Sequence, residues 1–159
     1  MSLIKSISGI RGTIGGQPGD NLTPIDIVKF SAAFGSIIAN GKSETRIVIG
    51  RDGRISGNMV NQLVVNTLTG LSTTPTVELA VKMENADGGI ILTASHNPKE
   101  WNALKLLNRE GEFISAETGA EVLQLADSGD ITFASVDKLG TVTEDESYLQ
   151  KHIDAVVNY

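Results

Sequence analysis

The chain contains no cysteine, which excludes disulfide bonds and thiolate metal sites. Aromatic residues make up only 4% of its 159 residues, so aliphatic side chains must fill the core. No segment resembles a signal peptide or is long and apolar enough to be a membrane span. Basic runs interleaved with aromatic residues, typical of nucleic-acid binding, are also missing. We therefore expect a cytoplasmic globular protein without nucleic-acid or membrane partners.

Charge is distributed unevenly along the chain. Residues 1–109 contain 11 Lys or Arg and 8 Asp or Glu, a net charge of +3. Residues 110–159 contain 2 and 11, a net charge of −9, so the overall charge of −6 comes from the C-terminal third. This asymmetry places an expected anion site within the first two thirds. The acidic third is equally well explained as solvated surface.

The clearest helix signal begins at Thr23, which is a good N-cap followed by Pro24 at the first helical position. Asp26 completes a capping box, and Asn40-Gly41 is expected to end the helix. Further helices are expected at about 56–69, at 75–84, from Ser115 to Ala126, and from Thr143 onward with Glu146 in a second capping box.

Short apolar runs at 46–50, 88–93 and 103–108 predict strands, whereas the glycine-rich residues 1–20 predict a loop. Strands that alternate with helices predict an α/β domain whose helices cover a mostly parallel mixed sheet. A strand is expected to be missing after Gly70, because two predicted helices follow one another there.

The segment GGIILTASHNP (88–98) poses the main chemical question, because a predicted strand stops abruptly before Ser95 and His96. A nucleophile elbow would need glycine where Thr93 and Asn97 stand, which disfavours a hydrolase. Neighbouring side chains diverge, so His96 is a poor base for Ser95. Ligands gather beyond the carboxyl ends of strands in open α/β sheets. An ordinary polar turn after a strand explains the same residues equally well.

Five basic residues lie in glycine-rich loops or just beyond predicted strands, where cations and backbone amides converge on phosphate groups. They are Arg11, Arg51, Arg54, Lys99 and Lys105. Each of them alone is more often a surface charge or an ion-pair partner, so they do not establish a pocket by themselves.

Four stretches together resemble the α-D-phosphohexomutase family, which includes phosphoglucomutase, phosphomannomutase and phosphoglucosamine mutase. They read SGIRG (8–12), GRDGR (50–54), STTPTVELAV (72–81) and ADGGIILTASHNPKEWNALK (86–105). The resemblance covers about residues 4–126 and implies the family's three-layer domain I over residues 1–137. Residues 138–159 would be a linker and helix leading into a second domain that this chain does not contain.

The resemblance implies that Ser95 carries a phosphoryl group, which it donates to a hexose monophosphate. The resulting bisphosphorylated sugar returns its other phosphate to the serine, so phosphate moves between the 1 and 6 positions. Lys105 would be a general acid/base, in a segment reading NALK where the family has NGxK. Arg11 would offset the phosphoserine charge and bind phosphate, and His96 would line the pocket. Thr93, Asn97 and Arg51 would bind substrate or phosphate.

The resemblance also implies Mg²⁺, held by the Ser95 phosphate and by three aspartates of an Asp-x-Asp-x-Asp loop in the second domain, and an activator of the glucose 1,6-bisphosphate type. This sequence has no such loop. We therefore expect a first-domain fragment that is inactive without domains II–IV. The alternative is a non-catalytic sugar-phosphate-binding module. Self-association is expected through apolar surface left uncovered, with Leu149, Ile153 and Val156 as the candidate face.

Overall fold

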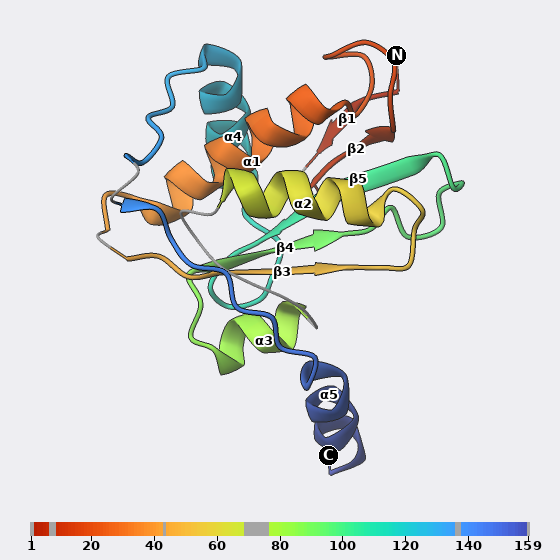
Figure 1. Ribbon diagram of the computed structural model, residues 1–159, viewed down its shortest axis with the longest axis vertical. Coiled ribbons are helices and arrows are strands. Elements are labelled where there is room, and N and C mark those ends of the chain that lie inside the picture. The colour runs from red at the N-terminus through yellow and green to blue at the C-terminus, as the bar shows by residue number, and fades with distance from the viewer. Residues whose placement is uncertain (1, 7–8, 43, 69–76, 136–137, 159) are drawn as a thin grey trace.

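The computed structural model describes residues 2–6, 9–42, 44–68, 77–135 and 138–158. These ranges form five strands and five helices (Figure 1). In chain order the elements are β1 (Ile4–Ser6), β2 (Gly9–Thr13), α1 (Pro24–Ala39), β3 (Ile47–Arg51), α2 (Gly57–Thr67), α3 (Val77–Met83), β4 (Gly88–Leu92), β5 (Trp101–Leu107), α4 (Ala116–Ser128) and α5 (Tyr148–Val157).

The strands form one open sheet in the order β1-β2-β5-β4-β3. The predicted α/β class, with a mixed sheet between helices, is confirmed. The expectation that the sheet is mostly parallel is wrong, because among the described strands only β3 and β4 pair in parallel and the other three pairings are antiparallel. Helices separate β3 from β4 along the chain, whereas β4 and β5 are joined directly by the loop 93–100, and such a short return makes neighbouring strands antiparallel.

Helices cover both faces of the sheet, which gives three layers (Figure 1). On one face, α1, α2 and α4 pack over the larger core cluster, in which the buried phenylalanines are Phe30 and Phe34. On the opposite face, α3 packs against β3 and β4 over a smaller cluster. The rest of both clusters is aliphatic, apart from Tyr148, as the low aromatic content predicts.

The N-terminal signals of α1 are confirmed in detail. The Thr23 side chain accepts a hydrogen bond from the Asp26 amide, and the Asp26 carboxylate accepts one from the Thr23 amide, which closes the capping box. Asn40 ends the helix in the left-handed region. Ser115 is the N-cap of α4, and its hydroxyl oxygen accepts a hydrogen bond from the Thr118 amide at 3.1 Å. The predicted strands at 46–50, 88–93 and 103–108 and the helix near 56–69 are also confirmed within one to two residues.

The N-terminal loop prediction is wrong, because β1 and β2 form a hairpin there and Arg11 lies within a strand. Glycine is required at the start of β2. A side chain at Gly9, whose φ is +111°, would place its Cβ 2.2 Å from the Leu104 carbonyl oxygen of β5. The glycines that suggested a loop therefore permit close pairing of two backbones.

The expected start of the helix at 75–84 and the strand expected to be missing after Gly70 both fall outside the described residues. The described part of that helix, α3, runs over Val77–Met83. None of the helices in the described ranges has the length and apolar character needed to cross a membrane.

The last helix starts at Tyr148 and not at Thr143, so the capping box with Glu146 is wrong. Just before the helix, the Asp145 carboxylate accepts a hydrogen bond from the Ser147 amide at 2.8 Å. Tyr148 is 2% exposed and inserts into the smaller core cluster, where its hydroxyl donates to Glu84. This single anchored side chain decides where the helix begins.

Beyond Tyr148, α5 projects away from the sheet (Figure 1). The apolar face expected to drive self-association is open, because Leu149, Ile153 and Val156 are 70%, 46% and 64% exposed. A hollow of about 380 Å³ lies beside this face and is lined by Leu79 of α3 together with residues of α5.

Raising the pH from 10 to 12 is expected to loosen α5. Burial, and next the hydrogen bond to Glu84, raises the pKa of Tyr148 from 10.0 to about 12, with Asp145 acting in the same direction and Arg46 opposing. The folded pKa is above the unfolded one, so this contribution to stability is complete below pH 10 and is lost as the pH rises to 12.

The urea midpoint should therefore fall more steeply between pH 10 and 12 in the wild type than in Tyr148→Phe. In NMR titrations of ¹³C-labelled tyrosine, Glu84→Gln should move the Tyr148 midpoint back toward 10. A Tyr148 midpoint near 10 in the wild type contradicts the docking described above.

The exposed face of α5 predicts concentration-dependent self-association. Ile153→Asp places a charge in the middle of this face and should shift the chain toward monomer in sedimentation equilibrium. Gln124→Glu, at an exposed position of α4, adds the same charge elsewhere and should leave association unchanged. A wild-type chain that stays monomeric at high concentration contradicts the expectation.

Candidate functional site

The site begins where β4 ends. β4 lies between β3 and β5, its side chains are almost wholly buried, and Leu92 is 0% exposed. Three residues later the chain reaches the surface at Ser95, which is exposed, while Ala94 before it remains buried. The Ser95 amide donates to the Thr93 hydroxyl oxygen at 3.0 Å, which closes a tight turn.

Ser95 has a φ of +53°, in the left-handed region. The other described non-glycine residues with positive φ are Asn40 and Asn85, and asparagine tolerates this region better than most residues do. For an L-residue the left-handed conformation costs roughly 1–2 kcal/mol. Such a conformation persists only where its surroundings enforce it, and it is enriched at functional sites.

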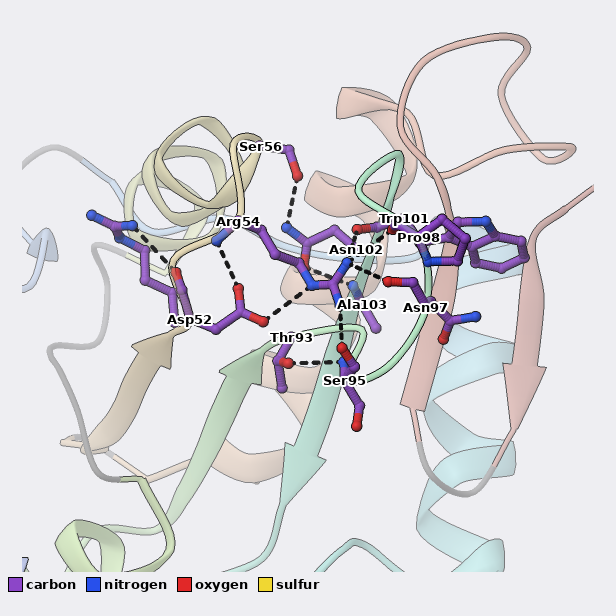
Figure 2. A network of polar contacts seen from close by, with 11 residues as sticks. Asp52, Arg54, Ser56, Thr93, Ser95, Asn97, Pro98, Trp101, Asn102 and Ala103 are labelled. Carbon is purple, nitrogen blue, oxygen red and sulfur yellow. Dashed lines mark hydrogen bonds and ion pairs between the residues drawn. The ribbon is translucent and has the colours of Figure 1, made fainter.

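Arg54 supplies those surroundings (Figure 2). Its Nη2 donates to the Ser95 carbonyl oxygen, and its Nη1 lies 3.0–3.1 Å from the carbonyl oxygens of Asn97, Pro98 and Trp101. Nε pairs with Asp52 Oδ2 at 3.1 Å. The Arg54 side chain is only 11% exposed, so one buried guanidinium ties the loop after β3 to the whole loop 95–101.

Asn102 anchors the far end of the same loop. It is 0% exposed, and its Nδ2 donates to the Ser56 hydroxyl oxygen at 2.9 Å, while its Oδ1 accepts from the Ala103 amide at 2.8 Å. Ser56 is the N-cap of α2 but makes no side-chain cap bond. Its hydroxyl instead fixes the start of β5, so α2 and β5 are coupled at the site.

Arg11 and Lys105 reach one face of the sheet from neighbouring strands. Arg11 pairs with Ala103, and Lys105 lies two residues further along β5, so side-chain alternation puts both cations on the same face. This is the face opposite the larger core, because Ile10 and Leu104 point into that core. The Arg11 Nε is buried without a hydrogen-bond partner.

Thr93 extends this arrangement to a third strand. Its amide donates to the Ala103 carbonyl oxygen at 3.2 Å, which continues the β4–β5 ladder for one step past Leu92. Because Ile91 pairs with Lys105, alternation places Thr93 on the face of Arg11 and Lys105. Three of the predicted site residues are thus brought to one edge of one face, next to Ser95.

The other predicted site residues are placed differently. Arg51 lies on the α2 side of the sheet, where a Cβ on Gly57 would stand 3.5 Å from its Nη1, so it is not on the face of Arg11 and Lys105. His96 is exposed. The Asn97 side chain is half-buried, and its Oδ1 has no hydrogen-bond partner. This side-chain oxygen is therefore free to accept a hydrogen bond from a ligand.

The sequence reasoning missed Asp52, Ser56 and Asn102, and it treated Arg54 as one loop cation among five. Asn102 did leave a signal, because it is a polar residue at the start of an apolar strand. Such a residue is buried only when hydrogen-bonded. The sharing of Arg54 among four carbonyl groups had no comparable signal, since it depends on the path of a loop some 40 residues away in sequence.

Ser95, His96, Pro98 and Lys99 are exposed, so the candidate site faces solvent as an open shelf. Two hollows formed by described residues lie elsewhere, one of about 210 Å³ between α2, β3 and residues 142–144 and another between α3 and α5. The described residues also contain no group of three His, Cys, Asp or Glu side chains that could hold a metal ion. The donor set of the described residues therefore does not by itself fit Mg²⁺.

Comparison with known proteins identifies this fold. Residues 3–132 match the family model "Phosphoglucomutase/phosphomannomutase, alpha/beta/alpha domain I". The chain is 33% identical to "Phosphoglucomutase/phosphomannomutase" of Thermococcus kodakarensis, covering 92% of this chain and 35% of the relative. It is 32% identical to "Probable phosphoglucosamine mutase" of Methanopyrus kandleri, covering 95% and 33%.

Among solved structures, the chain superposes on a phosphoglucomutase/phosphomannomutase family protein from Burkholderia thailandensis with a TM-score of 0.71 at 20% identity, covering 93% of this chain and 35% of the other. This likeness shows the fold. The chain spans about a third of the length of the curated relatives it matches. The match over most of its residues shows that the chain belongs to the phosphoglucomutase/phosphomannomutase family and contains its α/β/α domain I.

Proposed function

We propose that this chain is the phosphoserine-bearing domain of a phosphohexomutase, with Ser95 as the residue that carries the phosphoryl group. The observation that supports it best is the exposed Ser95 hydroxyl, presented in a left-handed turn at the carboxyl end of a buried strand. Arg11 and Lys105 point from neighbouring strands to the same edge of the sheet. Among the described residues, no histidine is hydrogen-bonded to Ser95, so none is placed to act as its base.

The proposed reaction needs positioning and charge neutralisation more than an activated nucleophile. Phosphoserine carries about −1.5 to −2 charges at neutral pH, and Arg11 and Lys105 would offset them. In the forward step the bond between Ser95 Oγ and phosphorus breaks and a bond to a sugar hydroxyl oxygen forms. The departing Ser95 Oγ takes a proton from Lys105, and Lys105 takes the proton of the sugar hydroxyl, so the serine leaves as a hydroxyl and the lysine stays cationic overall. In the return step the bond between phosphorus and the other sugar oxygen breaks and a bond from phosphorus to Ser95 Oγ forms, while the serine proton passes through Lys105 to that sugar oxygen.

The remaining residues have supporting parts in this proposal. The unpaired buried atoms, Arg11 Nε and Asn97 Oδ1, are suited to a donor and an acceptor for the phosphate and a sugar hydroxyl. Thr93 and His96 would line the approach, and Arg51 would bind phosphate only from the α2 side. Mg²⁺ is expected from the family resemblance, although the donor set of the described residues does not by itself fit it.

The open shelf requires the rest of such an enzyme to enclose the substrate, and the chain spans only a third of its relatives. We therefore propose domains II–IV as its partners, with residues 1–137 as domain I and 138–159 as the connection. The bisphosphorylated intermediate, a glucose 1,6-bisphosphate-type activator and a cytoplasmic location belong to this proposal.

The test supplies the missing part in trans, as the Thermococcus kodakarensis relative without its own first third. Glucose, mannose and glucosamine 1-phosphates are offered with the corresponding 1,6-bisphosphate and Mg²⁺, and 6-phosphate formation is measured. The mixture should turn over at least one sugar, and Ser95→Ala should abolish turnover. Ser128→Ala, an exposed serine at the end of α4, is the matched control and should retain it.

Two outcomes contradict the proposal. Full turnover by Ser95→Ala excludes the phosphoserine mechanism, and turnover by this chain alone excludes its dependence on further domains. Mass spectrometry gives a second measurement, in which incubation with the bisphosphate should add one phosphate to Ser95. Binding of the sugar phosphate without any phosphorylation would favour the alternative, a non-catalytic sugar-phosphate-binding module.

A further inference from the structure

We propose that Arg54 is a positioning residue that holds Ser95 in its left-handed conformation and thereby places the Ser95 hydroxyl for phosphoryl transfer. The conformational part stands on the geometry alone, and the part about transfer rests on the proposed function. Arg54 does not belong to the group of cations on the Arg11–Lys105 face, because its side chain is turned into the loop (Figure 2).

All three guanidinium nitrogens of Arg54 are engaged. Nη2 contacts the Ser95 carbonyl oxygen, Nη1 contacts three further carbonyl oxygens of the same loop, and Nε contacts Asp52. A guanidinium is planar and presents its donors in a fixed fork. Carbonyl groups from residues 95, 97, 98 and 101 are therefore oriented toward one rigid plane.

The bond to Ser95 acts on its backbone directly. Holding the Ser95 carbonyl oxygen fixes the peptide between residues 95 and 96, while the Thr93 hydroxyl holds the Ser95 amide on the other side. With both peptides held, the left-handed conformation is enforced. Bonds to a charged donor are stronger than neutral ones, so they offset the backbone strain at this position.

Asp52 holds the guanidinium in turn. Its Oδ2 pairs with Arg54 Nε and its Oδ1 accepts from the Arg54 amide, both at 3.1 Å. The Asp52 carboxylate thus holds both the backbone amide and the Nε of Arg54, which leaves the two terminal nitrogens for the loop. Lysine, a point charge with one nitrogen, cannot reproduce this arrangement.

The first experiment is a double-mutant cycle on this chain, read as the urea midpoint of unfolding. Ser95→Gly removes the strain, because glycine adopts positive φ freely. Arg54→Gln should therefore lower the midpoint by a smaller shift in the wild-type background than in the Ser95→Gly background, because in the wild type relaxation of the strained turn offsets part of the lost bonds. Equal shifts in the two backgrounds overturn the proposal.

The matched control for this cycle is Arg46→Gln. Arg46 also bonds a backbone carbonyl oxygen and a carboxylate, both of Glu84, but does so before the first residue of β3. Arg46→Gln should lower the urea midpoint by the same amount in the wild-type and Ser95→Gly backgrounds. Where Arg54→Gln does not fold, Arg54→Lys takes its place in the cycle with the same expected inequality.

The second experiment follows phosphorylation of Ser95 by mass spectrometry in the in trans mixture, over a range of hexose 1,6-bisphosphate concentrations. A displacement of the acceptor by about 1 Å costs on the order of 100-fold in rate. Arg54→Lys should lower the maximal rate to about that extent and leave the half-saturating concentration unchanged. An unchanged maximal rate overturns the role in transfer.

The two experiments separate the two proposals. Non-additivity in the cycle, together with a wild type whose Ser95 is never phosphorylated, refutes the proposed function and leaves the conformational role of Arg54 standing. Normal phosphorylation of both wild type and Arg54→Lys, with an additive cycle, refutes the role of Arg54 and leaves the proposed function standing.

Discussion

The strained turn at Ser95 is the constraint on which the candidate site depends. A serine at positive φ does not stay there unaided, and the hydrogen bonds that enforce it come from three directions. Thr93 holds its amide, Arg54 holds its carbonyl, and Asn102 fixes the far end of the loop through Ser56. Removing any one of these restraints gives the hydroxyl more freedom, so the site is a property of the loop as a whole.

The division of labour among the cations follows from the sheet. Side chains two residues apart along a strand share a face, so Arg11 and Lys105, on paired strands, meet on one side. Arg51 ends its strand on the other side. Arg54, only three residues later, has left the strand and turns its guanidinium inward, where it bonds carbonyl oxygens instead of an anion. Two arginines of one short motif therefore do different work.

Sequence reasoning succeeded where a local signal decides the structure. Thr23, Pro24 and Asp26 define a helix start through their own bonds, and Ser115 does likewise. It failed where the deciding contact is distant. Gly9 was read as a loop residue, although its lack of a side chain is what lets β2 approach β5. The start of α5 was misplaced because burial of Tyr148 against α3 and β5 overrides the local capping pattern. The directions of the strands were not predicted correctly either. A sequence in which strands alternate with helices does not show which strands become neighbours in the sheet, and this decides whether they pair in parallel.

The candidate site shows the same division. Ser95 was identifiable because a strand ends abruptly before it, and Lys105 because its segment fits a known pattern. The hydrogen bonds that hold the Ser95 turn were not identifiable from the sequence, because they join residues 52–56 to residues 95–102 across the sheet edge. Those bonds are satisfied within this chain, whereas Arg11 Nε and Asn97 Oδ1 remain unpaired beside an open shelf. Buried polar atoms are costly to leave unpaired. The domain thus holds Ser95, the proposed phosphoryl carrier, by itself but leaves Arg11 Nε and Asn97 Oδ1 unsatisfied, which is the state expected of the proposed site before a substrate and further domains complete it.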